Sequence, residues 1–489
     1  MRLDDDLKYF EEPEFKDILA KYEAAREAGQ AVYLDADDLT DVAEYYAMVH
    51  NDNERADEAI QLARQLHPDA VSPQIFVARQ AMQEGNIEEA RQLCDAIEDQ
   101  DHREVHFLRA ELLIREEKSN EAFSYLLHVS KTVDEDLDYF LYDSAYIFVD
   151  YRDFESALTF ANHLKDMAPA WFKTWELQAD VLLGLENYRS SLKYIEKMLD
   201  KDPFYVEAWN WRAEAYSGLF ELDKALESTD YALAVAPRDE RALQLKAWAT
   251  MQNGNPEEAH KIYLELQQMN PDSEQHWLYD SYCLYDMGNR EEAMRVLLQA
   301  EKMAEGMSVD QVSIYRHHAH LLSDNGEIDE ALRYIDWAEL EQEDTSMWLE
   351  YSIMRAQVYA DNGYVTQAMS IIEEATQHEN ADVPDILFRG GQVMFDATLF
   401  DVAAELFLRH NQLTKDTEQV HATYAYLAAI SHELHRPTEA ISFLKKAVQF
   451  QASNLKEVFG YILPQDVAVA DYCDYYFYHV YGRWPDSAR

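Results

Sequence analysis

Residues 172–205 read FKTWELQADVLLGLENYRSSLKYIEKMLDKDPFY, and two segments of the same length follow directly. They read VEAWNWRAEAYSGLFELDKALESTDYALAVAPRD and ERALQLKAWATMQNGNPEEAHKIYLELQQMNPDS. Prolines recur at a spacing of 34 residues, each closing one segment and preceding the next: Pro169, Pro203, Pro237 and Pro271. A fixed period of this length is the mark of a repeated supersecondary unit.

Other residue types recur at the same step inside these segments. Trp175 and Trp209 are equivalent, and two series of small residues follow: Ala179, Ala213 and Ala247, then Ser191, Ala225 and Ala259. Small side chains allow two helices to cross closely, whereas a larger residue there would overpack the contact. Proline lacks an amide proton and stops a helix. The pattern therefore predicts a hairpin of two helices in each segment.

An early aromatic residue, two small residues and a closing proline resemble the tetratricopeptide repeat (TPR) family. The resemblance implies an all-α, right-handed TPR superhelix (α-solenoid) of about twelve helix-turn-helix repeats. We expect an N-terminal capping helix in residues 1–36, the repeat array in 37–454 and aromatic-rich capping helices in 455–489. The array is expected to be continuous, with 305–311 as the candidate break.

The sequence departs from the family pattern three residues after the tryptophan position, where the family usually has Leu. Polar residues stand there, namely Gln178, Arg212, Lys246 and Asp280. The preceding position is apolar instead, with Leu177, Trp211, Leu245 and Tyr279. If the helices keep the family's orientation, this exchange moves hydrophobic surface towards the inner groove.

Composition excludes several classes of partner. The 489 residues carry 94 Asp and Glu against 42 Lys and Arg, a formal charge of −52. Nucleic acids and anionic membranes are recognised through clustered basic residues, so neither is an expected partner. Three scattered cysteines, an acidic N-terminus without a secretory pattern and the lack of a long apolar run favour a cytoplasmic, bacterial protein.

The resemblance also suggests a binding site, because in TPR proteins the first helix of each hairpin lines the concave face. Aromatic and polar residues at the inward positions are the candidate groove residues: Tyr139, Tyr142, Tyr146, Glu176, Asp180, Asn210, Trp211, Glu214, Trp248, Tyr279, Tyr282 and Tyr285. Rings interleaved with carboxylates suit a segment that bears Lys or Arg. The alternative is that several rings pack against the neighbouring hairpin and never meet a ligand.

Histidines provide the only local cluster of metal-capable side chains. His317 and His320 share a helical face, and Asp324 follows one turn later, but a tight site needs three or four ligands. No phosphate-binding loop, GxSxG elbow or dinucleotide-binding glycine pattern is present. We therefore expect neither catalysis nor a cofactor.

These observations predict a non-catalytic scaffold or adaptor that binds a basic or neutral peptide or partner protein in the concave groove. The alternative is a structural protein that self-associates, if only weakly, through the aromatic helix near the C-terminus, where Tyr472, Tyr475, Tyr476, Tyr478 and Tyr481 cover most sides. That helix is otherwise expected to be a largely buried cap. A His-dependent metal protein is a third hypothesis.

Overall fold

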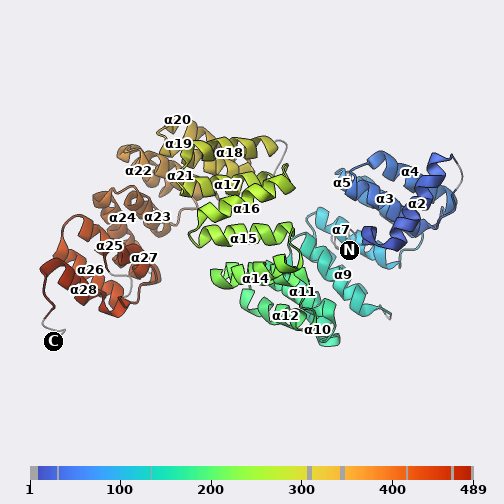
Figure 1. Cartoon of the computed structure of the whole chain (residues 1–489), viewed down its shortest axis with the longest axis horizontal. Helices are drawn as coiled ribbons and strands as arrows, with labels where there is room; N and C mark the ends of the chain where they lie inside the picture. Colours follow the sequence, from blue (N-terminus) through green and yellow to red (C-terminus); the bar gives the residue numbers. More distant parts are fainter. Residues whose placement is uncertain are drawn as a thin grey trace. The chain divides into compact units, whose positions relative to one another are not determined.

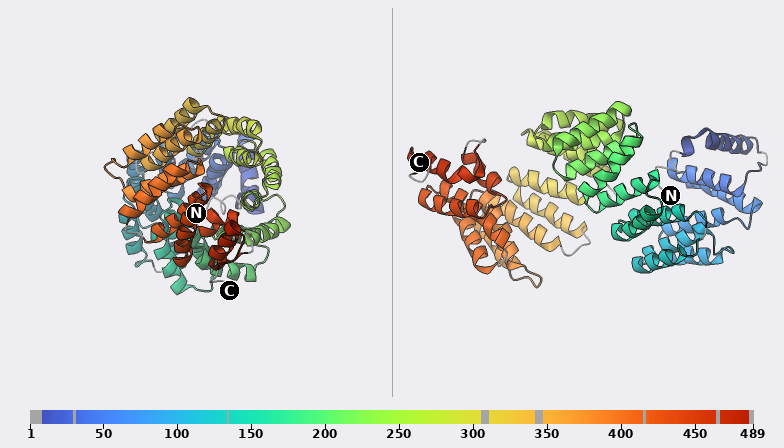
Figure 2. Two further views of the ribbon diagram at one scale, coloured as in Figure 1. Left: turned by 90° about the vertical axis from the view of Figure 1, so that its left-hand side faces the viewer. Right: turned by 90° about the horizontal axis from the view of Figure 1, so that it is seen from below.

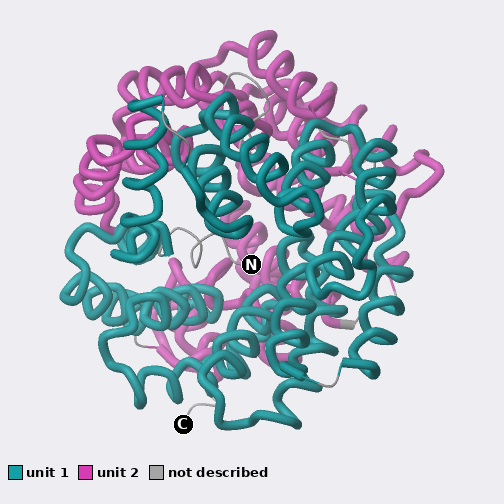
Figure 3. Tube along the Cα trace, turned by 90° about the vertical axis from the view of Figure 1, so that its right-hand side faces the viewer, with its two compact units in different colours: residues 1–254 teal, residues 255–489 magenta. Residues whose placement is uncertain are grey.

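The protein is all-helical, as predicted. A computed structural model describes residues 9–29, 32–133, 135–304, 311–341, 347–414, 417–463 and 467–485, and these ranges hold no β-strand. The chain divides into two compact units, residues 1–254 and residues 255–489 (Figure 3). Each unit is built from successive helices that lie side by side (Figure 1).

Unit 1 holds the helices α2 to α15. Their bounds are α2 (Pro13–Glu27), α3 (Ala36–Val49), α4 (Asn53–Leu66), α5 (Val71–Gln83), α6 (Ile87–Ala96), α7 (Arg103–Arg115), α8 (Ser119–Val129), α9 (Leu137–Asp150), α10 (Phe154–Met167), α11 (Phe172–Gly184), α12 (Tyr188–Lys201), α13 (Val206–Gly218), α14 (Leu222–Val235) and α15 (Glu240–Gln252). From α3 to α14 the helices form antiparallel hairpins, which stack in chain order within the unit, and α15 packs against α14 (Figure 2).

Unit 2 holds α16 to α28 and two short 3₁₀ helices. Their bounds are α16 (Pro256–Met269), α17 (Glu274–Asp286), α18 (Arg290–Met303), α19 (Gln311–Asp324), α20 (Ile328–Glu341), α21 (Trp348–Asp361), α22 (Val365–Ala375), α23 (Val383–Asp396), α24 (Phe400–Leu413), α25 (Thr417–Glu433), α26 (Pro437–Gln449), α27 (Leu455–Phe459), η2 (Gly460–Ile462), η3 (Val469–Asp471) and α28 (Tyr472–Tyr481). In the described residues, α3 to α26 are 24 successive helices, the number that twelve predicted two-helix repeats would supply.

The small residues lie at the closest contact of each hairpin. Ala179, Ala213 and Ala225 are fully buried. Where serine takes the place of one of the two contacting alanines, its hydroxyl donates a hydrogen bond to the backbone of the other helix. Ser191 of α12 donates to the carbonyl of Ala179 in α11 at 2.8 Å. Ser281 of α17 likewise donates to the carbonyl of Ala293 in α18, also at 2.8 Å. Serine is therefore tolerated at this buried contact because its hydroxyl has a partner.

The prolines and the tryptophans are connected by a hydrogen bond. The indole Nε1 of Trp175 donates to the carbonyl of Pro169 at 2.8 Å. The same bond joins Trp209 to Pro203, at 2.9 Å, and recurs in unit 2 between Trp277 and the carbonyl of Pro271. Each proline lies two residues beyond the end of a helix, where it cannot extend that helix. The connection between repeats is thus fixed by the aromatic residue of the following helix.

The boundary between the two units lies within the predicted repeat array. Contacts divide the chain between Gly254 and Asn255, inside the segment 240–273, although its sequence fits the period of the neighbouring segments. Of the expected break at 305–311, residues 305–310 lie outside the described residues. The domain boundaries at residues 36 and 454 stay a prediction.

The aromatic helix α28 is only partly buried, which corrects the sequence expectation. Tyr472 and Tyr476 face the core formed with α25, α26 and α27, and both are nearly inaccessible. Tyr475, Tyr478, Tyr481 and Trp484 are exposed. The helix has a single packed face because α26 is its main neighbour, so rings on the other sides have no protein to cover them.

Candidate protein-binding surface

The first helices of the hairpins in unit 1 carry an aromatic cluster around α9 and the start of α11. The ring of Tyr139 lies edge-on to Trp171 at 5.0 Å, and Tyr142 packs edge-on to Tyr146 at 4.8 Å. The ammonium of Lys173 is 4.6 Å from the ring centroid of Tyr142. Tyr139 is exposed, whereas Tyr142 and Tyr146 are buried. Of these three candidate tyrosines, Tyr139 is therefore accessible to a ligand, whereas Tyr142 and Tyr146 belong to the packed core beneath it.

Glu176 links three successive hairpins of unit 1. Tyr142 of α9 donates its hydroxyl proton to Oε2 of Glu176 at 3.0 Å, and Tyr205, just before α13, donates to Oε1. The carboxylate is buried. Burial of a charge without partners is costly, and the two phenols supply the hydrogen bonds that a carboxylate requires. Glu176 thus holds the first helices in register.

Farther along the unit, α13 and α15 contribute Asn210, Trp211, Glu214 and Trp248. Asn210 and Trp211 are buried, and Asn210 Nδ2 donates to Asp239 Oδ1 at 2.9 Å. Asp180, Glu214 and Trp248 are partly exposed. Glu214 accepts a hydrogen bond from the guanidinium of Arg241 at 2.7 Å, so this candidate carboxylate is already paired with a cation of the same chain.

The polar position that departs from the family pattern faces the preceding hairpin. Arg212 donates to Glu196 at 2.9 Å, and Lys246 donates to Asp230 at 2.7 Å. Of the apolar residues next to this position, Leu177 and Trp211 are buried between helices, whereas Leu245 and Tyr279 are partly exposed. The exchange therefore adds polar bonds between hairpins, and the apolar side chain enters the core in two of the four segments.

In unit 2, three candidate tyrosines of α17 lie in a row and are partly exposed. The ring centroids of Tyr279 and Tyr282 are 6.1 Å apart, and Tyr282 lies 3.9 Å from the imidazole of His317. The hydroxyl of Tyr285 donates to Asp324 at 2.7 Å. Burial, together with that bond to a carboxylate, raises the pKa of Tyr285 to about 12. Tyr282 and Tyr285 are thus held in place by contacts with α19, the first helix of the next hairpin.

The histidines of α19 are used for packing. His317 Nε2 lies 3.0 Å from the hydroxyl of Ser281, and burial lowers the pKa of His317 to about 3. Asp324 is also 3.0 Å from Arg290, while His320 is exposed. Within the described residues, no three His, Cys, Asp or Glu side chains are grouped to hold a metal ion. The metal hypothesis therefore finds no ligand set in this part of the chain.

Several residues of the surface were missed by the sequence reasoning. Trp171 and Tyr205 precede the first helical residue of successive repeats, and Lys173 and Arg241 lie on the first turns. A signal was available, because Trp171 and Tyr205 stand one period of 34 residues apart. The two cations carried no such signal. Their partners come from the preceding hairpin and are set by the packing.

The fold and its surface define a class, the helical-hairpin repeat proteins. The particular repeat is identified by sequence: the tetratricopeptide repeat family profile matches residues 177–240. Residues 177–240 are therefore a tetratricopeptide repeat segment, and the helical hairpins on either side are similar to it in fold. Proteins of this class generally mediate protein–protein interactions and act as non-catalytic scaffolds. No curated protein matches the chain.

Solved structures with a similar arrangement are distant in sequence. A tetratricopeptide repeat protein from Parabacteroides merdae is 16% identical, with a TM-score of 0.44, over 52% of this chain and 98% of its own. PilW, a type IV pilus biogenesis factor, is 18% identical, with a TM-score of 0.39, over 44% and 98%. The Cut9-Hcn1 hetero-tetramer of the APC/C is 12% identical, with a TM-score of 0.38, over 93% and 95%. At these values nothing about function follows.

None of the described helices is both long and apolar enough to cross a membrane.

Proposed function

We propose that this protein is a scaffold that binds a basic segment of a partner protein along the first helices of its hairpins. The observation that carries the proposal is the combination of partly exposed rings and carboxylates on these helices. In unit 1 they are Tyr139, Asp180, Glu214 and Trp248. The formal charge of −52 adds a long-range attraction for a basic segment. Buried candidates such as Trp211 support this surface without contacting the ligand.

The internal pair of Lys173 and Tyr142 supports this chemistry. Its ammonium–ring distance of 4.6 Å falls within the range of a cation–π contact. Lys173 also lies 5.9 Å from the ring centroid of Tyr139, so a Lys or Arg of a partner segment would contact the exposed part of this ring and the carboxylates that follow it. The absence of catalysis and of a cofactor remains part of this proposal.

The test is a paired capture of partners by the wild-type chain and by a Tyr139→Ala/Trp248→Ala/Tyr282→Ala variant, followed by binding measurements with the purified partner. These three rings are at least partly exposed, so circular dichroism should show a folded variant. Phe220→Ala is the matched control, because Phe220 is an exposed aromatic residue in the turn between α13 and α14 and is not one of the candidate groove residues. A partner that is lost only by the triple variant supports the proposal. Equal binding by all three proteins would overturn it.

A second candidate is self-association through α28. Trp484 stacks on Tyr478 at 4.8 Å and lies edge-on to Tyr475 at 5.0 Å, and all three are exposed. An exposed group of aromatic residues is typical of an interaction surface. Light scattering over a range of concentrations would detect an oligomer, and Tyr475→Ser/Tyr478→Ser should reduce it. A strict monomer at all concentrations would exclude this candidate.

A further inference from the structure

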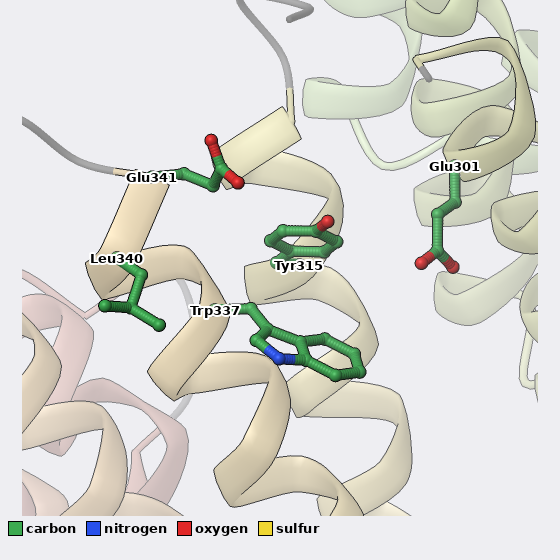
Figure 4. Close-up of a pocket in the computed structure, with 5 residues that line it drawn as sticks. All are labelled: Glu301, Tyr315, Trp337, Leu340 and Glu341. Atoms are coloured by element: carbon green, nitrogen blue, oxygen red, sulfur yellow. The ribbon is translucent and has the colours of Figure 1, made fainter. Parts of the chain in front are cut away.

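A pocket lies in unit 2 between the second helices α18 and α20 and the first helix α19, none of which carries a candidate groove residue. Its volume is about 380 Å³, and its lining comes from α18, α19 and α20: Glu301, Tyr315, Trp337, Leu340 and Glu341. Tyr315 and Trp337 lie between the carboxylates of Glu301 and Glu341 (Figure 4). The pocket is therefore an aromatic surface with a negative charge on either side.

The rings of the pocket form a continuous cluster. Tyr315 lies 5.7 Å from Tyr334 and 5.9 Å from Trp337, and Tyr334 is edge-on to Trp337 at 4.9 Å. Trp337 is 44% exposed, so its face is available to a ligand. Glu301 is held in place by the hydroxyl of Tyr334, which donates to Oε2 at 3.3 Å. His318 Nε2 lies 3.0 Å from the same oxygen.

Two other hairpins of this chain show what such rings bind. Trp175 and Tyr194 of the α11–α12 hairpin occupy the places of Tyr315 and Tyr334, at equal spacing along the sequence. There the ammonium of Lys197 lies 5.1 Å from the centroid of Tyr194 and 6.0 Å from that of Trp175.

The α25–α26 hairpin repeats this arrangement. Tyr424 and Phe443 supply the two rings, and the ammonium of Lys446 lies 4.9 Å and 5.6 Å from their centroids. Lys446 and Lys197 occupy the same position of the repeat. In two hairpins, therefore, the ring pair is covered by a lysine of the chain itself.

The α19–α20 hairpin has the rings but lacks the lysines. Trp337 stands at the position of Lys197, and Glu341 at the position of Lys201, whose ammonium lies 5.7 Å from Trp175. Among the described residues, no lysine or arginine lies over Tyr315, Tyr334 or Trp337. The sequences of 305–310 and 342–346 contain no Lys or Arg either. The two positions that hold lysines in the α11–α12 hairpin thus hold an additional ring and an additional acid in α19–α20.

We propose that this pocket binds the ammonium group of a lysine side chain on a partner protein, at a site separate from the candidate groove residues. The partner's lysine replaces the internal lysine of the equivalent hairpins. Its ammonium lies against Tyr315 and Trp337, and the carboxylates of Glu301 and Glu341 balance its charge. A cation–π contact gains strength when water is partly excluded, as in a pocket.

The test uses the full chain labelled with 5-fluorotryptophan, with the Trp337 fluorine resonance assigned by Trp337→Phe. The probe is a blocked five-residue peptide, Ala-Ala-Lys-Ala-Ala, compared with the same peptide carrying Nε-acetyl-lysine. At about 0.15 M salt, charges more than about 8 Å away are largely screened. We expect the lysine peptide to shift the Trp337 resonance in a saturable way and the acetylated peptide to leave it unchanged.

Two variants keep the Trp337 reporter and decide the proposal. Glu341→Lys introduces the counterpart of Lys201 and should weaken binding about fivefold or more, because the ammonium of the chain now occupies the pocket. Glu257→Lys makes the same charge change on α16, at an exposed residue that does not line the pocket, and should change the dissociation constant less than about twofold. Lysine is favourable at the end of a helix, so Glu341→Lys should fold.

Three outcomes would overturn the proposal. Equal shifts with the acetylated peptide would show that the ammonium is not recognised. Equal weakening by Glu341→Lys and Glu257→Lys would show attraction by the overall charge alone. A Trp337 resonance that moves with protein concentration in the absence of peptide would identify a second copy of the chain as the occupant.

Discussion

The hairpins α11–α12 and α19–α20 share one pattern at the helix contact and differ at most other positions, some of which change what each hairpin can bind. Both have a buried alanine at the helix contact, Ala179 in one and Ala319 in the other. Most other equivalent positions differ, and three of these differences have consequences that can be measured: Leu177 becomes His317, Glu186 becomes Gly326, and Lys197 becomes Trp337. The comparison teaches that the contact between the two helices fixes the hairpin, whereas the positions around it can acquire new properties without changing the fold.

The largest expected effect is on the shared helix contact. Ala179→Leu and Ala319→Leu should each destabilise their hairpin by about 1–3 kcal/mol, because a larger side chain overpacks a contact that has no free space. Thermal unfolding with hydrogen exchange would show both the size and the place of the loss. Similar costs in the two hairpins are expected. A cost in one hairpin only would contradict the view that they share this contact.

The pH dependence of stability should separate His317 from its equivalent Leu177. Burial lowers the folded-state pKa of His317 to about 3, whereas an unfolded histidine titrates near 6.5. Below pH ~6.5 the unfolded chain therefore binds a proton that the folded chain does not, and stability falls as the pH falls. At pH 5 this loss should be about 1–2 kcal/mol.

Carboxylates also change the stability between these pH values, but they do so equally in the wild type and in His317→Leu. The difference between the two proteins therefore isolates the contribution of His317. Urea unfolding of unit 2 at pH 7.5 and at pH 5 should show a smaller loss in His317→Leu. The matched control is His320→Leu, which removes an exposed histidine from the same helix and should retain the wild-type dependence. An unchanged dependence in His317→Leu would show that His317 is not the group responsible.

The turns between the two helices should respond in opposite directions to substitution. Glu186 has φ of 56°, a left-handed conformation that costs a side-chain-bearing residue energy, while Gly326 has φ of 79° at the equivalent position. Glu186→Gly removes this strain but increases the entropy of the unfolded chain, so the net stabilisation of unit 1 should be about 0.5–1 kcal/mol. Gly326→Ala should destabilise unit 2 by about 1 kcal/mol. Calorimetric midpoints would show shifts of opposite sign, and shifts of the same sign would refute the prediction.

The smallest effect is expected at the lysine that covers the rings of α11–α12. Lys197→Met should cost about 0.5 kcal/mol, the value of an exposed cation–π contact, since its ammonium lies 5.1 Å from Tyr194. Lys193→Met is the control, because Lys193 is exposed on the same helix α12. Denaturant midpoints of the two variants should differ by this amount. Equal midpoints would show that the internal lysine contributes nothing to stability.

Much of the fold could be predicted because the repeat is periodic. The spacing from Pro169 to Pro271 marked where the second helices end, and the small residues near Ala213 and Ala225 marked where paired helices touch. The indole-to-proline hydrogen bonds could not be predicted, because they depend on the path of the chain between helices. The partly exposed face of α28 was missed for a related reason: the sequence does not show how many neighbours a terminal helix has.

The candidate site was predicted only in outline. Tyr139 is an exposed inward position, but Tyr142, Asn210 and Trp211 are buried and connect neighbouring hairpins. Helical periodicity places these residues on one face and cannot say whether that face meets solvent or another hairpin. Their role as a binding surface stays a prediction. The pocket at Trp337 was not anticipated because its residues come from three helices, α18, α19 and α20.

By itself the sequence determined the repeat length, the helical hairpin and the residues at its closest contact, because these depend on interactions within a few tens of residues that recur in every segment. The tertiary structure alone decided where the chain divides, at Gly254, which rings are covered by a lysine and which form the open pocket beside Glu301 and Glu341. Burial and charge at those places are set by side chains that neighbouring helices bring together, and the spacing of one segment does not encode them.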